Sequence, residues 1–278
     1  MLRIWQATEA ARTFAAVILG CIVLWALCVW LFDLPKFLVP SPHTVLQEFL
    51  EKPQFYFANS LSTLWVSLGG FGLAVLGGLV LSIGIIRSVW LERTLYTLLV
   101  GLNSLPKVAL APLFVIWFGT GAISKMAVVI SIAIFPIVIG TVLGLRSIDP
   151  ELINMARAMR APQKRILWKL RFPQALPSLL SGMKVSISLA LVGTVVGEFI
   201  AGNKGLGSTI LAAQGTFDTT QVFVCIVLLG VLGAILFYAI DLVERYLIPW
   251  HPSHRGHKQQ TANPQRAPAA QGHAGVAH

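Results

Sequence analysis

Long apolar runs constrain the fold of this 278-residue chain more than any other feature of its sequence. A helix that crosses the roughly 30 Å hydrocarbon core of a bilayer needs about 20 apolar residues. Four runs approach or exceed that length without a charge, and two others contain one charge each, Lys107 and Glu198. In chain order the six predicted spans are 13–32, 60–86, 94–124, 126–145, 185–200 and 222–240. The sequence therefore predicts an all-α polytopic membrane protein with about six transmembrane helices.

The composition and the distribution of charge agree with a membrane protein. Only 12% of the residues are charged, whereas soluble domains carry about 25%. The net charge of +10 is typical of some nucleic-acid-binding proteins. However, most of the Lys and Arg fall in segments that a cytoplasmic N-terminus would keep inside, above all between 147 and 182, as the positive-inside rule requires. We therefore expect cytoplasmic N- and C-termini and no nucleic-acid partner.

The two ends of the chain differ in character. The first apolar run ends in bulky residues rather than a small-residue cleavage site, so we expect a retained helix, with residues 1–54 forming this span and an external connection. Residues 55–245 form the predicted core. Residues 246–278 contain few bulky apolar side chains, which predicts a cytoplasmic, largely disordered tail. Three tail histidines at a spacing of three are read either as a solvated segment or as a mobile metal site, and no other metal pattern is found in the sequence.

Three residues in the weaker spans are candidates for a translocation path or gate: Pro106, Lys107 and Glu198. Pro106 removes a backbone donor, and a broken helix at membrane depth is tolerated where protein or a water-filled cavity surrounds it. Lys107 either attracts an anion in such a path, or extends to the interface, or satisfies carbonyls freed by the prolines. Glu198 either anchors an external gate or pairs with a nearby donor.

The sequence shows no catalytic set and no nucleotide site. The glycines at 202, 205 and 207 follow an apolar span, and no Gly-Lys-Ser/Thr sequence accompanies them, so they predict a turn rather than a phosphate-binding loop. No Ser/His/Asp set or paired carboxylates can be placed together in a dry pocket. We therefore expect no enzymatic activity from this chain.

Residues 147–182 form the most basic segment, with six Lys or Arg and no acid between 154 and 177. Asp149-Pro150-Glu151 is a strong helix start, and apolar residues then recur on one face at Leu152, Met155, Ala156 and Met159. Ala161-Pro162 predicts an interruption, and Pro173 and Pro177 predict a turn back into the bilayer. Such a pair of short amphipathic helices suits either an anionic lipid surface or a cytoplasmic protein partner.

This segment resembles the cytoplasmic EAA loop of ABC-importer membrane subunits. The family pattern is Glu-Ala-Ala, three residues, Gly, nine residues, then Ile-x-Leu-Pro. Here Asn154, Met155 and Ala156 take the Glu-Ala-Ala places, Arg160 takes the glycine place, and Leu170, Phe172 and Pro173 take the Ile, Leu and Pro places. The Glu and the Gly of the pattern are therefore absent. The resemblance implies an ATPase-coupling loop that includes Asn154, Met155, Ala156, Met159, Arg160, Ala161, Pro162 and Pro173, with a short helix over about 151–165 in an ATPase groove.

Three further stretches, LPKVALAPLFVIWFGTGAISK, VVGEFIAGNKGLG and YLIPWHPS, resemble the nitrate/sulfonate/taurine branch of these permeases, over residues 38–253 in all. The resemblance implies a type I ABC importer permease fold, a homodimeric pore in a bacterial inner membrane, two cytoplasmic ATPase subunits and an external binding protein. It also implies that ATP and Mg²⁺ bind to the ATPases, that this chain holds no cofactor, and that the substrate is a small anion such as nitrate, sulfonate or taurine, or a vitamin precursor.

An ion-coupled secondary transporter or channel is the alternative. Proton or sodium coupling commonly uses intramembrane carboxylates. Glu198 is the only acidic residue in any predicted span, and this favours the importer.

Overall fold

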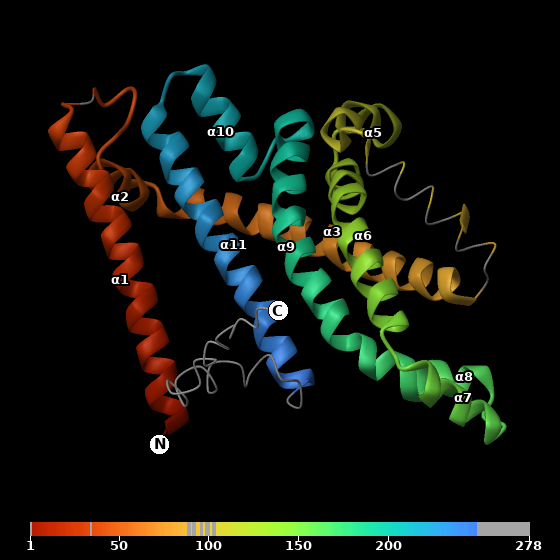
Figure 1. Ribbon diagram of the computed structural model, residues 1–278. Helices are drawn as coiled ribbons and strands as arrows, with labels where there is room; N and C mark the ends of the chain where they lie inside the picture. The colour runs from red at the N-terminus through yellow and green to blue at the C-terminus, as the bar shows by residue number, and fades with distance from the viewer. Residues whose placement is uncertain are drawn as a thin grey trace, which may run out of the picture.

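The computed structural model describes residues 2–33, 35–87 and 104–248, with five isolated positions between 88 and 103. Every regular element in these residues is helical, which confirms the all-α prediction. In chain order the elements are α1 (Leu2–Leu31), α2 (Pro42–Glu51), α3 (Pro53–Arg87), η1 (Lys107–Leu110), α5 (Ala111–Phe118), α6 (Ala122–Arg146), α7 (Pro150–Ala158), α8 (Gln163–Ile166), the π-helix η2 (Leu167–Arg171), α9 (Phe172–Ala201), α10 (Leu206–Gly215) and α11 (Thr219–Leu247) (Figure 1).

Four helical segments of the described chain are long and apolar enough to cross a membrane: Pro53–Ile86, Ala122–Arg146, Gln163–Ala201 and Thr219–Leu247. Two shorter apolar helices, Leu19–Leu31 and Lys107–Phe118, fall in the first and third predicted spans. Most of residues 94–103, in the first part of that third span, lies outside the described residues. The arrangement is that of a polytopic membrane protein.

The core lies where α3, α6 and α9 cross, and α3 runs at a steep angle to the other long helices (Figure 1). Two glycines allow α3 to approach α6 closely. A Cβ on Gly70 would lie 2.6 Å from Cβ of Val129, and a Cβ on Gly78 would lie 2.7 Å from Cγ2 of Ile137. This glycine-rich span therefore packs inside the bundle, because a side chain at either position would separate the helices.

Helices α6 and α9 make the most extensive contact in the described chain, and their backbones almost touch. A Cβ on Gly140 would lie 2.7 Å from the carbonyl oxygen of Ser178, and one on Gly182 would lie 2.6 Å from that of Pro136. Small residues permit this approach, in which van der Waals packing replaces the hydrophobic driving force that lipid does not supply. The two helices therefore form the most tightly joined pair of the bundle.

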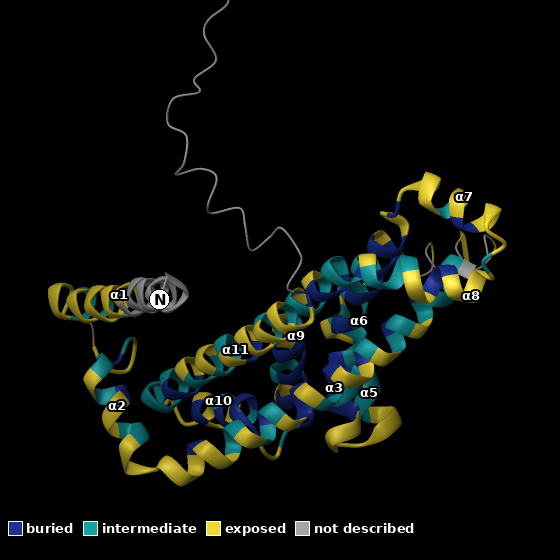
Figure 2. Cartoon of the chain, turned by 90° about the horizontal axis from the view of Figure 1, so that it is seen from below, coloured by how far each residue is buried: buried dark blue, intermediate teal, exposed yellow. Residues whose placement is uncertain are grey.

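Helix α1 stands at the periphery and has a largely exposed surface over its C-terminal half (Figure 2). It contacts the rest of the molecule through α2 and through Trp25, whose ring stacks on Phe223 of α11 at a centroid distance of 5.7 Å. Helix α2 begins at Pro42, where Ser41 Oγ caps the helix by accepting a hydrogen bond from the Thr44 N–H.

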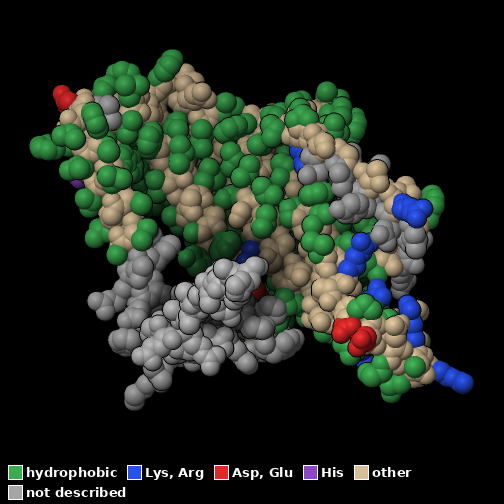
Figure 3. All heavy atoms as spheres, viewed as in Figure 1, with side chains coloured by type: hydrophobic (Ala, Val, Ile, Leu, Met, Phe, Trp, Pro, Cys, Tyr) green, Lys and Arg blue, Asp and Glu red, His purple; other side chains and the backbone are tan. Residues whose placement is uncertain are grey.

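The two ends of the bundle differ. Helices α5 and α10 lie at one end, and α7 and α8 lie at the other, together with the N-terminal end of α1 (Figure 1). Lys and Arg side chains gather over α7 and α8, whereas hydrophobic side chains cover the long helices (Figure 3). The basic segment 147–182 therefore contributes most of the positive charge at one end of the molecule.

The predicted turn at Pro173 and Pro177 is wrong. Helices α8, η2 and α9 form one continuous helical segment, and Pro177 lies inside α9. The π-helical turn Leu167–Arg171 ends two residues before Pro173, and the Phe172 N–H donates to the carbonyl oxygen of Leu167. A widened turn gives the proline ring room beside the preceding carbonyls, so the chain enters the membrane without a break.

The last span also extends further than predicted. Helix α11 continues past Ile240 to Leu247, although Asp241 and Glu244 are acidic. The ammonium of Lys184, on α9, lies 2.5 Å from a carboxylate oxygen of each. Paired charges cost far less to bury than isolated ones. A span predicted only from its uncharged residues therefore ends too early, at Ile240.

Candidate coupling loop and buried carboxylate site

Helix α7 begins as the sequence predicts and ends earlier than expected. The Glu151 N–H donates to Oδ1 of Asp149 at 2.8 Å, and Pro150 occupies the first turn. The helix ends at Ala158, so the expected helix over about 151–165 is wrong at residues 159–162, and residues 163–165 belong to α8. A turn at 159–162 separates α7 from α8, at the interruption that Ala161-Pro162 predicts.

Arg160 ends α7 in a left-handed conformation, with a φ of 55°. The Ala161 N–H donates to the carbonyl oxygen of Ala156 at 3.0 Å, and the Arg160 N–H donates to that of Arg157 at 2.8 Å. These two bonds are those of a Schellman cap, which places glycine at the left-handed position. Arg160 stands in the glycine place of the EAA pattern. The chain therefore adopts the left-handed turn without glycine, and the Arg160 side chain makes this conformation strained.

We expect Arg160→Gly to stabilise the α7 cap by about 1 kcal/mol, because glycine adopts this conformation without a steric penalty. Hydrogen exchange of the Ala161 amide in the purified permease would measure the effect as about fivefold slower exchange. Arg160→Ala is the matched control, since it removes the same charge and keeps the strain. Equal exchange in the two variants would contradict this account of the bend.

The exposed tip of α7 is apolar. Leu152, Met155 and Met159 are 41%, 58% and 76% exposed, respectively. Ala156 shares their face in the sequence pattern but is only 8% exposed, so it packs against the chain itself. Of the other predicted loop residues, Asn154, Arg160 and Pro162 are exposed, and Ala161 and Pro173 are half-buried. The surface available to a partner therefore consists of Leu152, Met155 and Met159, bordered by basic side chains.

The helix break predicted at Pro106 is present. Pro106 has an extended backbone, η1 begins at Lys107, and the Ala109 N–H donates to the carbonyl oxygen of Pro106 at 2.8 Å. The Lys107 ammonium lies 5.9 Å from the centroid of the Phe135 ring on α6. This cation–π geometry supports a packing role for Lys107. Lys107 and Glu198 are not brought together, since Glu198 lies near Lys125, about 15 Å along α6 from Phe135.

Glu198 is completely buried and fully engaged in hydrogen bonds. Its Oε1 accepts a hydrogen bond from Thr63 Oγ1 at 2.9 Å, and its Oε2 accepts one from the Gly207 N–H at 2.8 Å. The Leu206 N–H in turn donates to Thr63 Oγ1 at 2.8 Å. The carboxylate therefore caps the N-terminus of α10, where the helix dipole favours negative charge.

Two further side chains hold the connection 202–205 between α9 and α10. Asn59 Oδ1 accepts from the Gly205 N–H at 2.9 Å, and the Lys125 ammonium donates to the carbonyl oxygen of Lys204 at 3.1 Å. Lys125, which the sequence places in an external segment, is only 6% exposed. The turn predicted for these glycines is confirmed, and α3, α6 and α9 all contribute a side chain to it. We call Asn59, Thr63, Lys125, Glu198 and this connection the Glu198 network.

Sequence reasoning found Glu198 but missed its partners. Asn59, Thr63 and Ser67 recur at every fourth residue of an apolar helix, which places them on one face of α3. Each contacts the α9–α10 region, since Ser67 Oγ lies 2.8 Å from Thr194 Oγ1. This polar stripe is the signal that could have identified them. The network holds a loop in place.

We expect Thr63→Val to lower the free energy of unfolding by about 2–4 kcal/mol, because it leaves both the buried Glu198 oxygen and the Leu206 N–H without a partner. Thr63→Ser keeps the hydroxyl and is the matched control. Thermal unfolding of the permease in detergent would show a lower Tm for the valine variant only. A Tm equal to that of wild type would show that Thr63 does not support the carboxylate.

Metal-binding arrangements are not found among the described residues, where no group of three or more His, Cys, Asp or Glu lies together. The three histidines of the tail lie outside the residues that the structure describes.

Comparison with known proteins identifies the family of this chain. Residues 70–249 match the family of binding-protein-dependent transport system inner membrane components. The chain is 39% identical to a riboflavin transport system permease of Chloroflexus aurantiacus over 234 residues, which cover 84% of this chain and 87% of the relative. It is 33% identical to a formylaminopyrimidine transport permease of Halalkalibacterium halodurans over 251 residues, which cover 90% of this chain and 98% of the relative.

A solved structure shares the fold. The chain superposes on a subunit of a methionine ABC transporter in an inward-facing conformation with a TM-score of 0.57 and 22% identity, over 66% of this chain and 93% of that one. The helical architecture thus matches that of an ABC importer permease, as expected. With the sequence match over most of its length, the chain belongs to the binding-protein-dependent inner membrane permeases and is the transmembrane subunit of an ABC importer, a transport subunit and not an enzyme.

Proposed function

We propose that two copies of this chain form the translocation path of the importer, and that each copy binds a cytoplasmic ATPase through the exposed tip of α7. The observation that carries this proposal is the exposure of Met155 and Met159 at the end of the molecule, beyond the candidate spans. Exposed apolar side chains with a charged border are typical of protein interfaces. In this arrangement ATP and Mg²⁺ bind to the ATPases, and this chain holds no cofactor.

The orientation follows from charge. The α7 end carries the basic side chains and the N-terminal end of α1, so it faces the cytoplasm of a bacterial inner membrane under the positive-inside rule (Figure 3). The end with α5 and α10 then faces outward, where a binding protein delivers the substrate. The tail beyond 248 would be cytoplasmic.

Coupling requires that the ATPases contact α7 differently in their open and closed states, because a partner shifts an equilibrium only by its differential affinity. The Schellman cap at Arg160 and the Asp149 cap fix both ends of α7. A helix fixed at both ends transmits a displacement with little loss to local unwinding. The short loop is therefore suited to carry the ATPase motion into α9.

The relatives support a heteroaromatic vitamin or vitamin precursor as substrate, since the two compared above are named for riboflavin and formylaminopyrimidine. A small anion such as nitrate, a sulfonate or taurine is the second candidate, and the sequence feature that favours it is Lys107. The Lys107 ammonium lies 5.9 Å from the centroid of the Phe135 ring, a contact that favours a packing role for this residue.

Reconstitution in proteoliposomes with the cognate ATPase and binding protein would test the function. Uptake of riboflavin or a pyrimidine precursor is expected with enclosed ATP and not with a proton or sodium gradient alone. An excess of taurine or nitrate should not compete. Uptake driven by an ion gradient without ATP would favour a secondary transporter, and competition by the anions would reverse the order of the two substrate candidates.

A further inference from the structure

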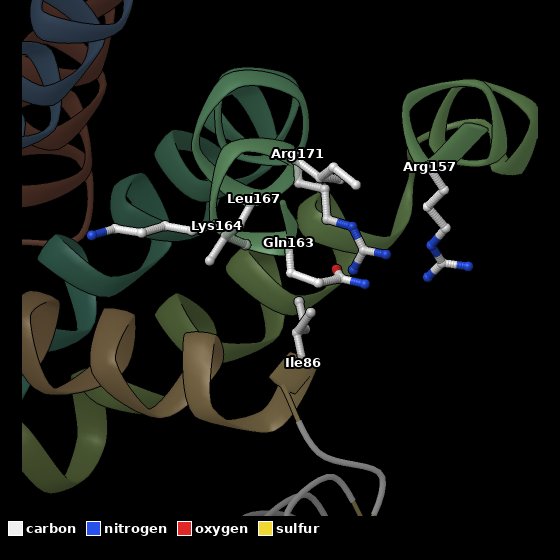
Figure 4. Close-up of a pocket in the computed structure, with 7 residues that line it drawn as sticks. Ile86, Arg157, Gln163, Lys164, Leu167 and Arg171 are labelled. Carbon is white, nitrogen blue, oxygen red and sulfur yellow. The ribbon is translucent and has the colours of Figure 1, made fainter. Parts of the chain in front are cut away.

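A cavity of about 630 Å³ lies between α7, the α8–η2 segment and the last turn of α3 (Figure 4). Its polar lining comprises Arg157, Gln163, Lys164 and Arg171. Its apolar lining comprises Ile86, Ile166 and Leu167. The volume is within the usual range of small-ligand sites, about 300–1,000 Å³. The cavity is therefore large enough for more than a single ion.

The polar groups of Arg157, Gln163 and Arg171 line the same cavity, although they come from different elements. Figure 4 shows the Arg171 guanidinium and the Gln163 amide side by side, with the Arg157 guanidinium facing the same space from α7. The Lys164 side chain extends in another direction, away from this group. Two guanidinium groups and one amide thus form a donor set that can surround one anion.

The donors lack an anion within the chain. Arg171 Nε is buried and has no hydrogen-bond partner. In the part of the chain that the structure describes, neither Arg157 nor Arg171 forms an ion pair with an acidic residue. Arg171 as a whole is half-buried and Arg157 is exposed. A buried N–H without a partner costs free energy, and an external anion at Arg171 would satisfy it. Guanidinium groups bind phosphate by paired, charge-assisted hydrogen bonds, which makes phosphate the best chemical match.

The position of the cavity points to a membrane lipid as the source of the phosphate. Ile86 is the last residue of one apolar candidate span, and Lys164 and Arg171 lie in the basic first turns of another helical segment, so the cavity joins an apolar helix end to a cationic one. The apolar side chains of Ile86, Ile166 and Leu167 form the other half of its lining, beside the cationic groups. A phospholipid presents the same sequence of groups, with a phosphate above the first carbons of its acyl chains.

We propose that this cavity binds the phosphate group of an anionic phospholipid, with Arg157 and Arg171 as the anion ligands. The bound lipid joins α7 to the ends of α3 and α9. The site is separate from the exposed tip formed by Leu152, Met155 and Met159, which stays available to a protein partner.

Native mass spectrometry of the full-length permease, extracted in mild detergent from membranes that contain phosphatidylglycerol, tests the proposal. We expect wild type to retain one phosphatidylglycerol per chain and the R157Q/R171Q variant to lose it. K164Q removes a charge from the same cavity lining but outside the donor set, and is expected to retain the lipid. R157K/R171K keeps the charges and should bind at least tenfold more weakly than wild type, which separates recognition from misfolding.

A second measurement distinguishes the source of the phosphate. Delipidated permease is titrated with phosphatidylglycerol, with phosphatidylethanolamine or with inorganic phosphate, and the change in Tm is recorded. Stabilisation by phosphatidylglycerol alone supports a lipid site. Equal stabilisation by inorganic phosphate would overturn the lipid as the source. Equal lipid retention by wild type and R157Q/R171Q, or no retention and no stabilisation of wild type, would overturn the site itself.

Discussion

Gly205→Ala is expected to destroy the Glu198 network and reduce substrate uptake to background. Gly205 has a φ of 124°, which L side chains rarely adopt, and an added Cβ would lie 2.0 Å from Oε1 of Glu198. Backbone strain costs about 1–3 kcal/mol, and displacement of the carboxylate adds the loss of its buried hydrogen bonds, at about 1–3 kcal/mol each. The total is a large share of a typical stability of about 5–15 kcal/mol.

Folded yield and Tm, measured by size-exclusion chromatography and thermal unfolding, would record this loss. Gly215→Ala is the matched control, because a Cβ at the end of α10 would meet no atom within 4 Å. It should leave yield and Tm unchanged. A Gly205→Ala permease with wild-type Tm and uptake would mean that the connection can rearrange around Glu198 without cost.

The M155D/M159D variant is expected to lose the ATPase and ATP-driven uptake while it remains folded in the membrane. Both side chains are exposed, so the free permease gains two solvated charges at little cost to its stability. In the complex the same charges would be buried against the partner, and burial of two unpaired carboxylates costs several kcal/mol. We expect at least a hundredfold weaker association, measured by co-purification and by titration with the purified ATPase.

Phe217→Asp provides the control for this prediction. Phe217 is 89% exposed, has a φ of 56° that Asp tolerates, and lies at the opposite end of the bundle, in the turn between α10 and α11. It adds a carboxylate in place of an exposed apolar side chain and should leave ATPase binding unchanged. If M155D/M159D binds the ATPase as tightly as wild type, α7 is not the docking surface.

Helix starts were accessible from the sequence because their determinants are local. Pro106 and Asp149-Pro150 act on backbone groups within one turn, and each sets the boundary that it predicts. The effect of Pro173 is different. A proline breaks a helix unless the preceding turn widens, and the widening at η2 depends on how the whole segment packs.

The two candidate sites also differ in whether local sequence or tertiary packing determines them. The two short helices of the candidate coupling loop could be placed from the sequence, because its basic residues and caps are contiguous. The Glu198 network could not be assembled, since Thr63 lies 135 residues away from Glu198 in the chain. Periodicity also assigns Ala156 to the apolar face of α7 without stating that this residue packs inward. Spacing gives the residues that share a face, whereas tertiary packing decides which of them remain exposed.

The continuity of α8, η2 and α9 has a mechanical consequence. The 39 residues from Gln163 to Ala201 form one continuous helical segment that bends where η2 joins α9, with the candidate coupling loop at one end and Glu198 near the other (Figure 1). Under the proposed docking at α7, the motion of an ATPase on one membrane surface reaches the opposite surface through this single segment. There it must either carry α3 and α6 along or pull Glu198 away from Thr63.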